Sequence, residues 1–191
     1  MRTVWLVRHA ERADFNLEGI WDITWPDRAR GLGQDPDDAP LTDAGGRQAR
    51  HAASLIHGKL NRIYSSPFLR CLETARAISK VHEVELVIST DLTEWMNPEW
   101  FSYTYEHFNE IHFNENSAHF TPGYPEIPES KESHIERWKR IYQTLKEMSE
   151  EKFPIVLVTH GGGVHHLLNL HDLDLMSGKG VQFADVYRIE L

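Results

Sequence analysis

Two short runs of apolar residues stand out along the chain: VWLV at 4–7 and IVLV at 155–158. Runs that are apolar at every position leave no polar face, which is typical of strands buried on both sides. The pattern therefore predicts buried strands over residues 3–7 and 155–160. Further strands are predicted at 61–66, 84–88 and 185–191. The last of these alternates apolar and polar residues, as an outer strand does.

Between these strands, apolar residues recur at helical spacing. Thr42 precedes one such stretch and is expected to be its N-cap, because its hydroxyl can accept from the free N–H groups of the first turn. Ser66 is expected to cap the next helix, with Pro67 at the first helical position. Residues 131–151 predict an amphipathic helix whose inner stripe is Ile135, Trp138, Ile141, Leu145 and Met148. Strands that alternate with helices predict an α/β domain with a largely parallel sheet.

Two segments break this regularity within what we expect to be a single domain over 1–191. Residues 14–40 show no clear period and contain the turn-rich GQDPDDAP, so a long loop is expected there. Residues 93–130 are expected to form an inserted cap over the main domain, with a second small core as the alternative. The aromatic residues of this cap are Trp95, Trp100, Phe101, Tyr103, Tyr105, Phe108, Phe113, Phe120 and Tyr124.

Composition narrows the class of protein. Of 191 residues, 40% are hydrophobic and 26% charged, as in an ordinary globular protein. The single cysteine, Cys71, excludes an internal disulfide and favours a reducing compartment. There is no signal-peptide pattern and no membrane-spanning apolar run, so we expect a cytoplasmic protein that does not bind membranes. The net charge of −9 argues against loose binding to nucleic acid.

Arginine and histidine residues follow directly after the two predicted buried strands. The first strand runs into Arg8 and His9, and the second runs into His160. In open α/β sheets, binding sites form outside the carboxyl ends of the strands. Arg70 is expected in the first turn of a helix that follows another strand, so it should reach the same edge. The sequence therefore predicts that these four side chains converge.

Arginines around a histidine at such an edge form a pocket for a dianion. Arg8, Arg12 and Arg70 can each direct two N–H groups onto phosphate oxygens. Their charges also disfavour protonation of His9, because an imidazolium beside them would be repelled. A neutral imidazole is the form that can act as a nucleophile. The pattern predicts a poised histidine inside a cationic cup.

The motifs LVRHAER, PLTDAG, YSSPFLRCLETA, LTEW and VTHGGG resemble, in this order, those of the histidine phosphatase superfamily, also called phosphoglycerate mutase-like. The resemblance covers nearly the whole chain, with the loop and the cap as variable parts. It implies a three-layer α/β sandwich with a mostly parallel central sheet and helices on both faces. The RH-x-x-R form, SPFLRC-x-x-TA and the EW pair look most like suppressor of T-cell receptor signalling type phosphatases.

The resemblance also implies roles for named residues. His9 would attack phosphorus, with Arg8, Arg12, Arg70 and His160 binding the phosphoryl oxygens. Glu94 would act as the general acid and base. No metal and no cofactor is implied. Two departures from the family pattern stand out: Ala10 replaces the usual glycine after the histidine, and the glycine run at 161–163 is expected to loosen the helix start.

Two other chemistries are weighed against this one. Cys71 and Arg76 fit the bare spacing of a cysteine phosphatase, but the intervening LETA lacks the glycines that cradle phosphate. His165, His166 and His171 invite a metal site, but no carboxylate or cysteine stands at ligand spacing. We therefore expect no metal.

The sequence favours a metal-independent phosphomonoester hydrolase that acts through a phosphohistidine. The alternatives are a phosphoglycerate mutase-type phosphotransferase and a weakly active domain that binds phosphorylated partners. The substrate is expected to be a phosphorylated small molecule or a phosphotyrosine protein, and cap aromatics that face the pocket would favour an aromatic or apolar leaving group. A homodimer through the edge of the final strand is left open.

Overall fold

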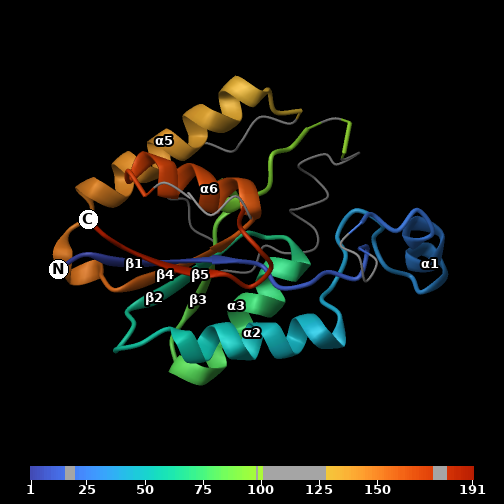
Figure 1. Ribbon diagram of the computed structural model, residues 1–191, viewed down its shortest axis with the longest axis horizontal. Helices are drawn as coiled ribbons and strands as arrows, with labels where there is room; N and C mark the ends of the chain where they lie inside the picture. The colour runs from blue at the N-terminus through green and yellow to red at the C-terminus, as the bar shows by residue number, and fades with distance from the viewer. Residues whose placement is uncertain (16–19, 98, 101–127, 174–179) are drawn as a thin grey trace.

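Five strands form one sheet in the computed structural model, which describes residues 1–15, 20–97, 99–100, 128–173 and 180–191 (Figure 1). The strands are β1 (Thr3–Arg8), β2 (Arg62–Ser65), β3 (Leu86–Ile88), β4 (Ile155–Thr159) and β5 (Val186–Glu190). Their order across the sheet is β3-β2-β4-β1-β5. All neighbouring pairs are parallel except β1 and β5, so the final strand is an antiparallel edge, as its alternating pattern indicates.

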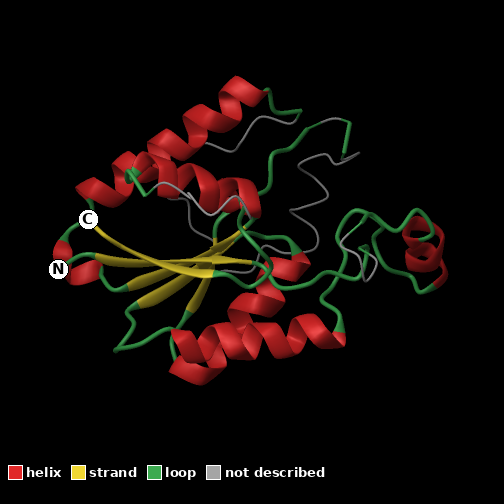
Figure 2. Ribbon diagram, viewed as in Figure 1, coloured by secondary structure: helices red, strands yellow, loops and turns green. Residues whose placement is uncertain are grey.

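Helices cover both faces of the sheet, which gives the three-layer α/β sandwich that the sequence predicts (Figure 2). On one face lie α2 (Asp43–Leu55) and α3 (Leu69–His82), and on the other lie α5 (Lys131–Glu147) and α6 (Gly161–Leu170). Alternate strand residues enter the two cores: Leu6 and Leu157 pack against α5 and α6, while Val7 and Val158 pack against α2 and α3. This division explains why the central strands are apolar at every position.

Short elements complete the described chain. The 3₁₀ turns η1 (Thr90–Leu92) and η2 (Glu150–Lys152) follow β3 and α5, so the helix predicted over 131–151 ends earlier, at Glu147. Thr42 caps α2 as expected, because its hydroxyl accepts from the Gly45 N–H. Among the described residues, no helix is long and apolar enough to cross a membrane.

The prediction that Ser66 caps α3 is wrong. The helix begins at Leu69, and Phe68 occupies the N-cap position without a side-chain hydrogen bond. The Ser66 hydroxyl accepts from the Phe68 N–H over 3.4 Å, ahead of the helix, and lies 2.9 Å from His160 Nε2. The first N–H of the helix, that of Leu69, donates instead to Asp38 Oδ1 over 2.7 Å, so a distant side chain takes the place of the local cap.

The prediction of a structureless loop over 14–40 is also wrong in part. It contains α1 (Trp25–Gly31), which forms a small lobe apart from the main body (Figure 1). Trp25, Ala29 and Ala39 form the apolar centre of this lobe, and the Trp25 indole N–H donates to the Pro36 carbonyl over 2.8 Å. Seven helical residues are too few to show a clear period in the sequence.

Most of the predicted aromatic cap lies outside the described residues. This holds for Phe101, Tyr103, Tyr105, Phe108, Phe113, Phe120 and Tyr124. Trp95 and Trp100 are described, and their ring centroids lie 5.3 Å apart in a T-shaped contact. The cap over 93–130 therefore stays a prediction.

Candidate active site

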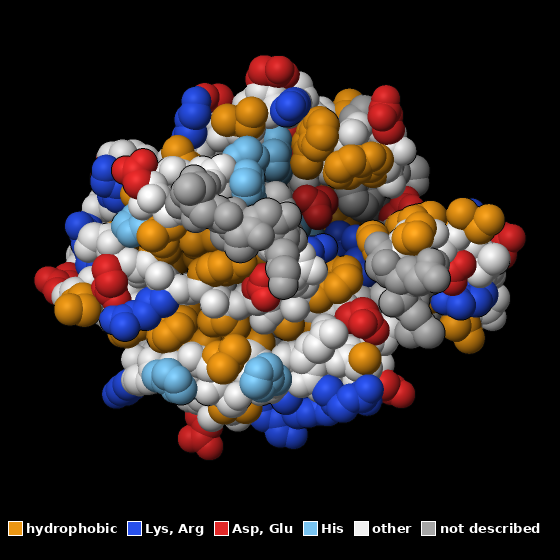
Figure 3. All heavy atoms as spheres, in the orientation of Figure 1, with side chains coloured by type: hydrophobic (Ala, Val, Ile, Leu, Met, Phe, Trp, Pro, Cys, Tyr) orange, Lys and Arg blue, Asp and Glu red, His pale blue; other side chains and the backbone are white. Residues whose placement is uncertain are grey.

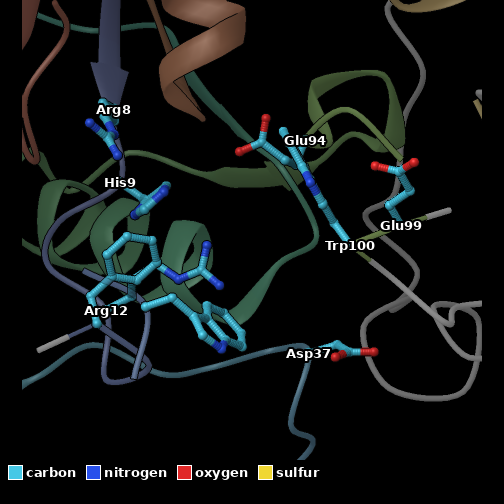
Figure 4. A pocket seen from close by; sticks show the side chains of 9 residues that line it. Arg8, His9, Arg12, Asp37, Glu94, Glu99 and Trp100 are labelled. Atoms are coloured by element: carbon cyan, nitrogen blue, oxygen red, sulfur yellow. The ribbon is translucent and has the colours of Figure 1, made fainter. Parts of the chain in front are cut away.

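The paired ends of β1 and β4 bring the two predicted histidines together. Arg8 is in register with Thr159, so the residues that follow each strand leave the sheet side by side. The His9 and His160 ring centroids lie 5.3 Å apart with the rings in a T-shaped contact. A cavity of about 550 Å³ opens beside His9 (Figure 4). Its lining residues are Arg8, His9, Arg12, Phe15, Trp21, Asp37, Glu94, Glu99 and Trp100.

His9 is held rigidly by backbone and side-chain hydrogen bonds. Its N–H donates to the Thr159 carbonyl over 2.9 Å, and its own carbonyl accepts from the Ala184 N–H over 3.2 Å. His9 Nδ1 lies 2.8 Å from the Ala10 carbonyl oxygen, an acceptor only, so this nitrogen carries the proton. In the neutral ring, the lone pair is therefore on Nε2. That is the atom left to react.

The surroundings of His9 keep its imidazole neutral. The side chain is buried, and burial lowers its pKa well below the usual 6.5 because a charged ring would lose its hydration. The nearby charges of Arg70, Arg8 and Arg12 lower the pKa further, in that order. The arginine charges predicted from the sequence thus act on His9 together with burial of its ring, which the sequence did not indicate.

Arg70 supplies N–H groups that no described protein atom satisfies. It lies in the first turn of α3 and is fully buried, with its guanidinium carbon 4.1 Å from the Phe68 ring centroid. Its Nε and Nη1 have no hydrogen-bond partner within the described chain, and Asp38 Oδ1 is 3.9 Å from Nη1. Buried donors without acceptors are unfavourable, and an anion that reached them would remove this cost.

His160 connects the floor of the site to Glu94. Its Nδ1 lies 3.4 Å from Arg70 Nη2 and 3.4 Å from a Glu94 carboxylate oxygen, while Nε2 faces Ser66. Burial lowers its pKa well below 6.5, and Arg70 and His9 add to the effect. Sequence reasoning missed Ser66 as the partner that fixes this ring.

The two remaining arginines are restrained by different partners. Arg8 Nη1 donates to the Val181 carbonyl over 2.6 Å, and the guanidinium lies 4.2 Å from the Phe183 ring centroid. Arg12 is buried and forms a two-pronged ion pair with the buried carboxylate of Asp14. Nothing in the sequence pattern indicated this Asp14 contact, which fixes the Arg12 fork beside the cavity.

Glu94 lies across the cavity from His9 (Figure 4). One of its carboxylate oxygens accepts from the Trp95 N–H over 3.1 Å, and the other approaches His160. Its side chain is about one-fifth exposed, at 19%, so water can reach it. A carboxyl group here faces both the histidine pair and the open side of the cavity.

A buried arginine of α5 holds the backbone that carries Glu94. Arg137 Nη1 donates to the carbonyls of Asp91 and Thr93 over 2.6 and 3.1 Å, and Nη2 donates to the Glu94 carbonyl over 3.2 Å. The other side of the guanidinium is paired with Glu129 at 2.8 and 2.7 Å. This clamp was missed in the sequence, although a buried charge on the apolar face of a helix is the signal that could have revealed it.

Glu129 and His134 complete the clamp. Burial alone would raise the pKa of Glu129, but hydrogen bonds from Arg137 and His134 lower it to about 2. His134 Nδ1 lies 3.3 Å from the Glu129 carboxylate. The Glu129 carboxylate is thus ionised at neutral pH and can hold Arg137 against the Glu94 backbone.

The last glycine of the run after His160 has a packing role that the sequence did not indicate. The helix α6 begins at Gly161, directly after His160. A Cβ on Gly163 would lie 2.2 Å from a ring carbon of Trp138, so this glycine allows α6 to pack closely on α5. Ala10 is accommodated as well: it is fully buried, and its N–H donates to the Thr74 hydroxyl over 3.0 Å.

The cysteine chemistry weighed above does not fit the structure. Burial raises the pKa of Cys71 to about 12, so the group is a protonated thiol at neutral pH. Its sulfur lies 3.5 Å from His160 Nε2, below the floor of the site. Arg76 is exposed on α3. The pair does not form a phosphate loop.

The histidines of α6 have contacts outside the cavity. His165 contacts Asn169 over 2.9 Å, and His171 contacts the Tyr142 hydroxyl over 3.0 Å. Burial lowers the pKa of His166 to about 4. Within the described ranges, no three His, Cys, Asp or Glu side chains are grouped to hold a metal ion.

Known proteins are similar in sequence to this chain. A putative phosphoserine phosphatase 2 from Hydrogenobacter thermophilus is 30% identical over 176 residues, covering 89% of this chain and 78% of that protein. The 55 kDa subunit of transcription factor tau from Saccharomyces cerevisiae is 27% identical over 84% of this chain. The chain spans only 38% of the length of this yeast relative.

A solved structure shows the same fold. Ecdysone phosphate phosphatase from Bombix mori, in complex with tungstate, has a TM-score of 0.68 and 18% identity, covering 100% of this chain and 89% of that one. The closer resemblance to suppressor of T-cell receptor signalling type phosphatases stays a prediction. Residues 4–189 match the family described as the histidine phosphatase superfamily (branch 1). The chain therefore belongs to this superfamily and carries a phosphatase domain of its type.

Proposed function

We propose that this protein hydrolyses phosphomonoesters through a phosphohistidine on His9. The observation that carries the proposal is the state of that side chain. It is a neutral, buried imidazole whose Nδ1 is tied to Ala10, and it lies beside the unsatisfied donors of Arg70. A phosphoryl group would satisfy those donors and present its phosphorus to Nε2.

In the first step, His9 Nε2 attacks phosphorus in line with the leaving oxygen. The bond between phosphorus and that oxygen breaks, and Glu94 donates the proton that the leaving alkoxide needs. In the second step, Glu94 takes a proton from water, whose oxygen attacks the phosphohistidine. His9 and inorganic phosphate are released. General acid assistance of this kind contributes roughly 10²–10⁴-fold. Arg8, Arg12, Arg70 and His160 bind the phosphoryl oxygens throughout.

The test is hydrolysis of p-nitrophenyl phosphate by wild type and His9→Ala, each with and without a chelator. The exposed His57 provides a matched control, His57→Ala. We expect activity that survives chelation, survives His57→Ala and disappears with His9→Ala. An acid-labile phosphoenzyme should form in wild type and in His57→Ala, and should be absent from His9→Ala. Activity that falls with chelator would favour a metal-dependent reaction and contradict the proposal.

Two rival functions are distinguished by further assays. A mutase would interconvert phosphoglycerates faster than it releases inorganic phosphate. A domain that binds phosphorylated partners would show phosphopeptide binding with turnover near background. We place the phosphatase in the cytoplasm, because its one cysteine is a free thiol, as in proteins of reducing compartments. Its substrate would be a phosphorylated small molecule or a phosphotyrosine protein.

A further inference from the structure

The outer walls of the cavity are aromatic and acidic, whereas its floor is basic. The walls would contact the leaving group of a bound phosphate ester. We propose that the site selects phosphate monoesters with a flat, uncharged aromatic leaving group and disfavours leaving groups that carry a carboxylate or a second phosphate. This inference rests on the proposed function, because it names the substrate class of the same site. Two independent features of the walls support it.

The first feature is a set of aromatic side chains at the mouth of the cavity. Phe15, Trp21 and Trp100 line it, and the two tryptophans are 42% and 56% exposed. Tryptophan is usually well buried, so two accessible indoles at one opening mark a surface that gains by contact with an apolar ring. Figure 3 shows apolar side chains on both sides of a hollow in which basic side chains are recessed.

Backbone contacts hold these aromatic side chains in place. The Trp100 N–H donates to the Asn97 carbonyl over 3.0 Å, and its ring contacts Trp95. Phe15 and Trp21 face each other across an isolated β-bridge, with ring centroids 6.1 Å apart. These contacts restrain the side chains of both walls, and such restraint lowers the conformational entropy that is lost when a substrate binds.

The aromatic wall begins where the phosphate cup ends. The Arg12 guanidinium carbon lies 5.1 Å from the Phe15 ring centroid and 6.0 Å from that of Trp21. A phosphoryl group held by Arg12 would consequently place the first atoms of its leaving group beside these rings. Ring stacking and phosphate binding can then occur in one substrate.

The second feature is the charge of the outer lining. Arg8 and Arg12 are the only cations of the described lining, and both lie at the floor with His9. The charged residues farther out are Asp37 and Glu99, and Figure 4 shows them on the side away from Arg8. A leaving group with its own anionic charge would meet carboxylates there. Repulsion of like charges in a partly enclosed cavity weakens such binding.

An adjoining groove offers the nearest alternative path for a charged leaving group. It has a volume of about 360 Å³ and contains Lys131, His134 and His166. The His166 pKa, lowered to about 4 by burial, leaves that imidazole uncharged at neutral pH. The groove shares Arg8 with the main cavity, and Lys131 is the one further Lys or Arg side chain in its described lining, outside the main cavity. A preference for bisphosphates would show that this path is used and would overturn the inference.

The aromatic preference is tested with two alkyl phosphates of similar leaving-group basicity, 2-(2-naphthyl)ethyl phosphate and hexyl phosphate. Both esters release an alkoxide, so the comparison is free of the higher intrinsic reactivity of aryl phosphates, whose leaving groups are less basic. We expect kcat/KM to favour the naphthyl ester by about tenfold, mainly through KM. The ratio should fall toward one in Trp21→Ala and in Trp100→Ala. Ile23→Ala, at an 85% exposed residue outside the cavity lining, should keep the ratio.

The charge preference is tested with 2-phenylethyl phosphate and its para-carboxylate. We expect wild type to favour the uncharged ester by about tenfold at low salt, and less at high salt because ions screen the repulsion. The double variant Asp37→Asn, Glu99→Gln should bring the ratio toward one. Equal rates in wild type, or a preference for the carboxylate, would overturn the inference. Hydrolysis of p-nitrophenyl phosphate through His9 would still support the proposed function in that case.

Discussion

The floor and the mouth of the cavity are built in opposite ways. At the floor, His9, Arg70 and His160 are buried at the ends of strands and the start of a helix. At the mouth, Trp21 and Trp100 lie in loops and are exposed. The groups proposed to transfer phosphate are therefore fixed by the sheet. Those proposed to select the substrate lie on loops, whose sequence can vary without disturbing the sheet.

The two regions also differ in how their polar groups are satisfied. Arg70 keeps buried donors without partners, which is unfavourable for the folded protein and favourable for binding an anion. Among the described residues of the mouth, no buried side-chain donor or acceptor lacks a partner. Substitutions at the floor should therefore lower activity without lowering the free energy of unfolding. Substitutions at the mouth should not show this opposition.

The largest expected effect is in Arg70→Met. We expect kcat/KM for p-nitrophenyl phosphate to fall by about 10³-fold, because two phosphate donors and a charge are lost. The free energy of unfolding should stay the same or rise, since an apolar side chain replaces a buried, incompletely paired cation. Urea unfolding and steady-state kinetics measure both. Arg76→Met, on the exposed side of the same helix, is the control. A strong loss of stability in Arg70→Met would contradict the proposed difference between floor and mouth.

Glu94→Gln should have the next largest effect, and its size should depend on the substrate. We expect kcat/KM for hexyl phosphate to fall by roughly 10²–10³-fold, because an alkoxide needs a proton to leave. The fall for p-nitrophenyl phosphate should be smaller, since nitrophenolate leaves without one. Glu132→Gln, at an exposed residue of α5, serves as the comparison. Equal losses for both substrates would remove Glu94 from the acid role.

Arg137→Met tests whether the clamp on the Glu94 backbone positions the acid. We expect kcat for hexyl phosphate to fall by about ten- to a hundredfold with a small change in KM, because a displaced acid loses alignment. The selective loss on hexyl phosphate should resemble that of Glu94→Gln. A purely structural role would lower the rates on both substrates equally. Adding Arg137→Met to Glu94→Gln should cause little further loss on hexyl phosphate.

The smallest effect concerns the dependence of stability on pH. Burial and nearby arginines lower the pKa values of His9 and His160 well below 6.5, so in acid the unfolded chain binds protons that the folded one does not. Stability should therefore fall as pH drops below about 6.5, by about 1.4 kcal/mol per pH unit for each histidine. Urea unfolding at pH 7.5 and 5.5 measures this slope. His9→Asn should reduce it, and mouth variants such as Trp100→Ala should leave it unchanged.

Much of the frame could be predicted because it follows from local patterns. Apolar runs gave the buried strands, and the position of His9 and His160 directly after them placed both at one edge of the sheet. Thr42 could be predicted as a cap because the interaction spans only three residues. Periodicity and short-range hydrogen bonds are properties that a linear sequence displays.

What could not be predicted depends on contacts between distant segments. Arg137 meets carbonyls of residues 91–94, and no pattern within α5 says which backbone its guanidinium reaches. Ser66 was assigned to its own helix because its partner, His160, lies in another part of the chain. Gly163 was taken as a flexible residue, although the Trp138 ring occupies the space of its missing side chain.

The burial of Cys71 should make the floor of the site resistant to oxidation. Peroxide attacks thiolates, and enzymes whose nucleophile is a thiolate are silenced when it is oxidised. Here the thiol beside His160 is buried and has a pKa of about 12, and the proposed nucleophile is a nitrogen. Turnover should then continue during oxidative bursts that inactivate cysteine phosphatases, so this domain could keep removing phosphate when other phosphatases stop.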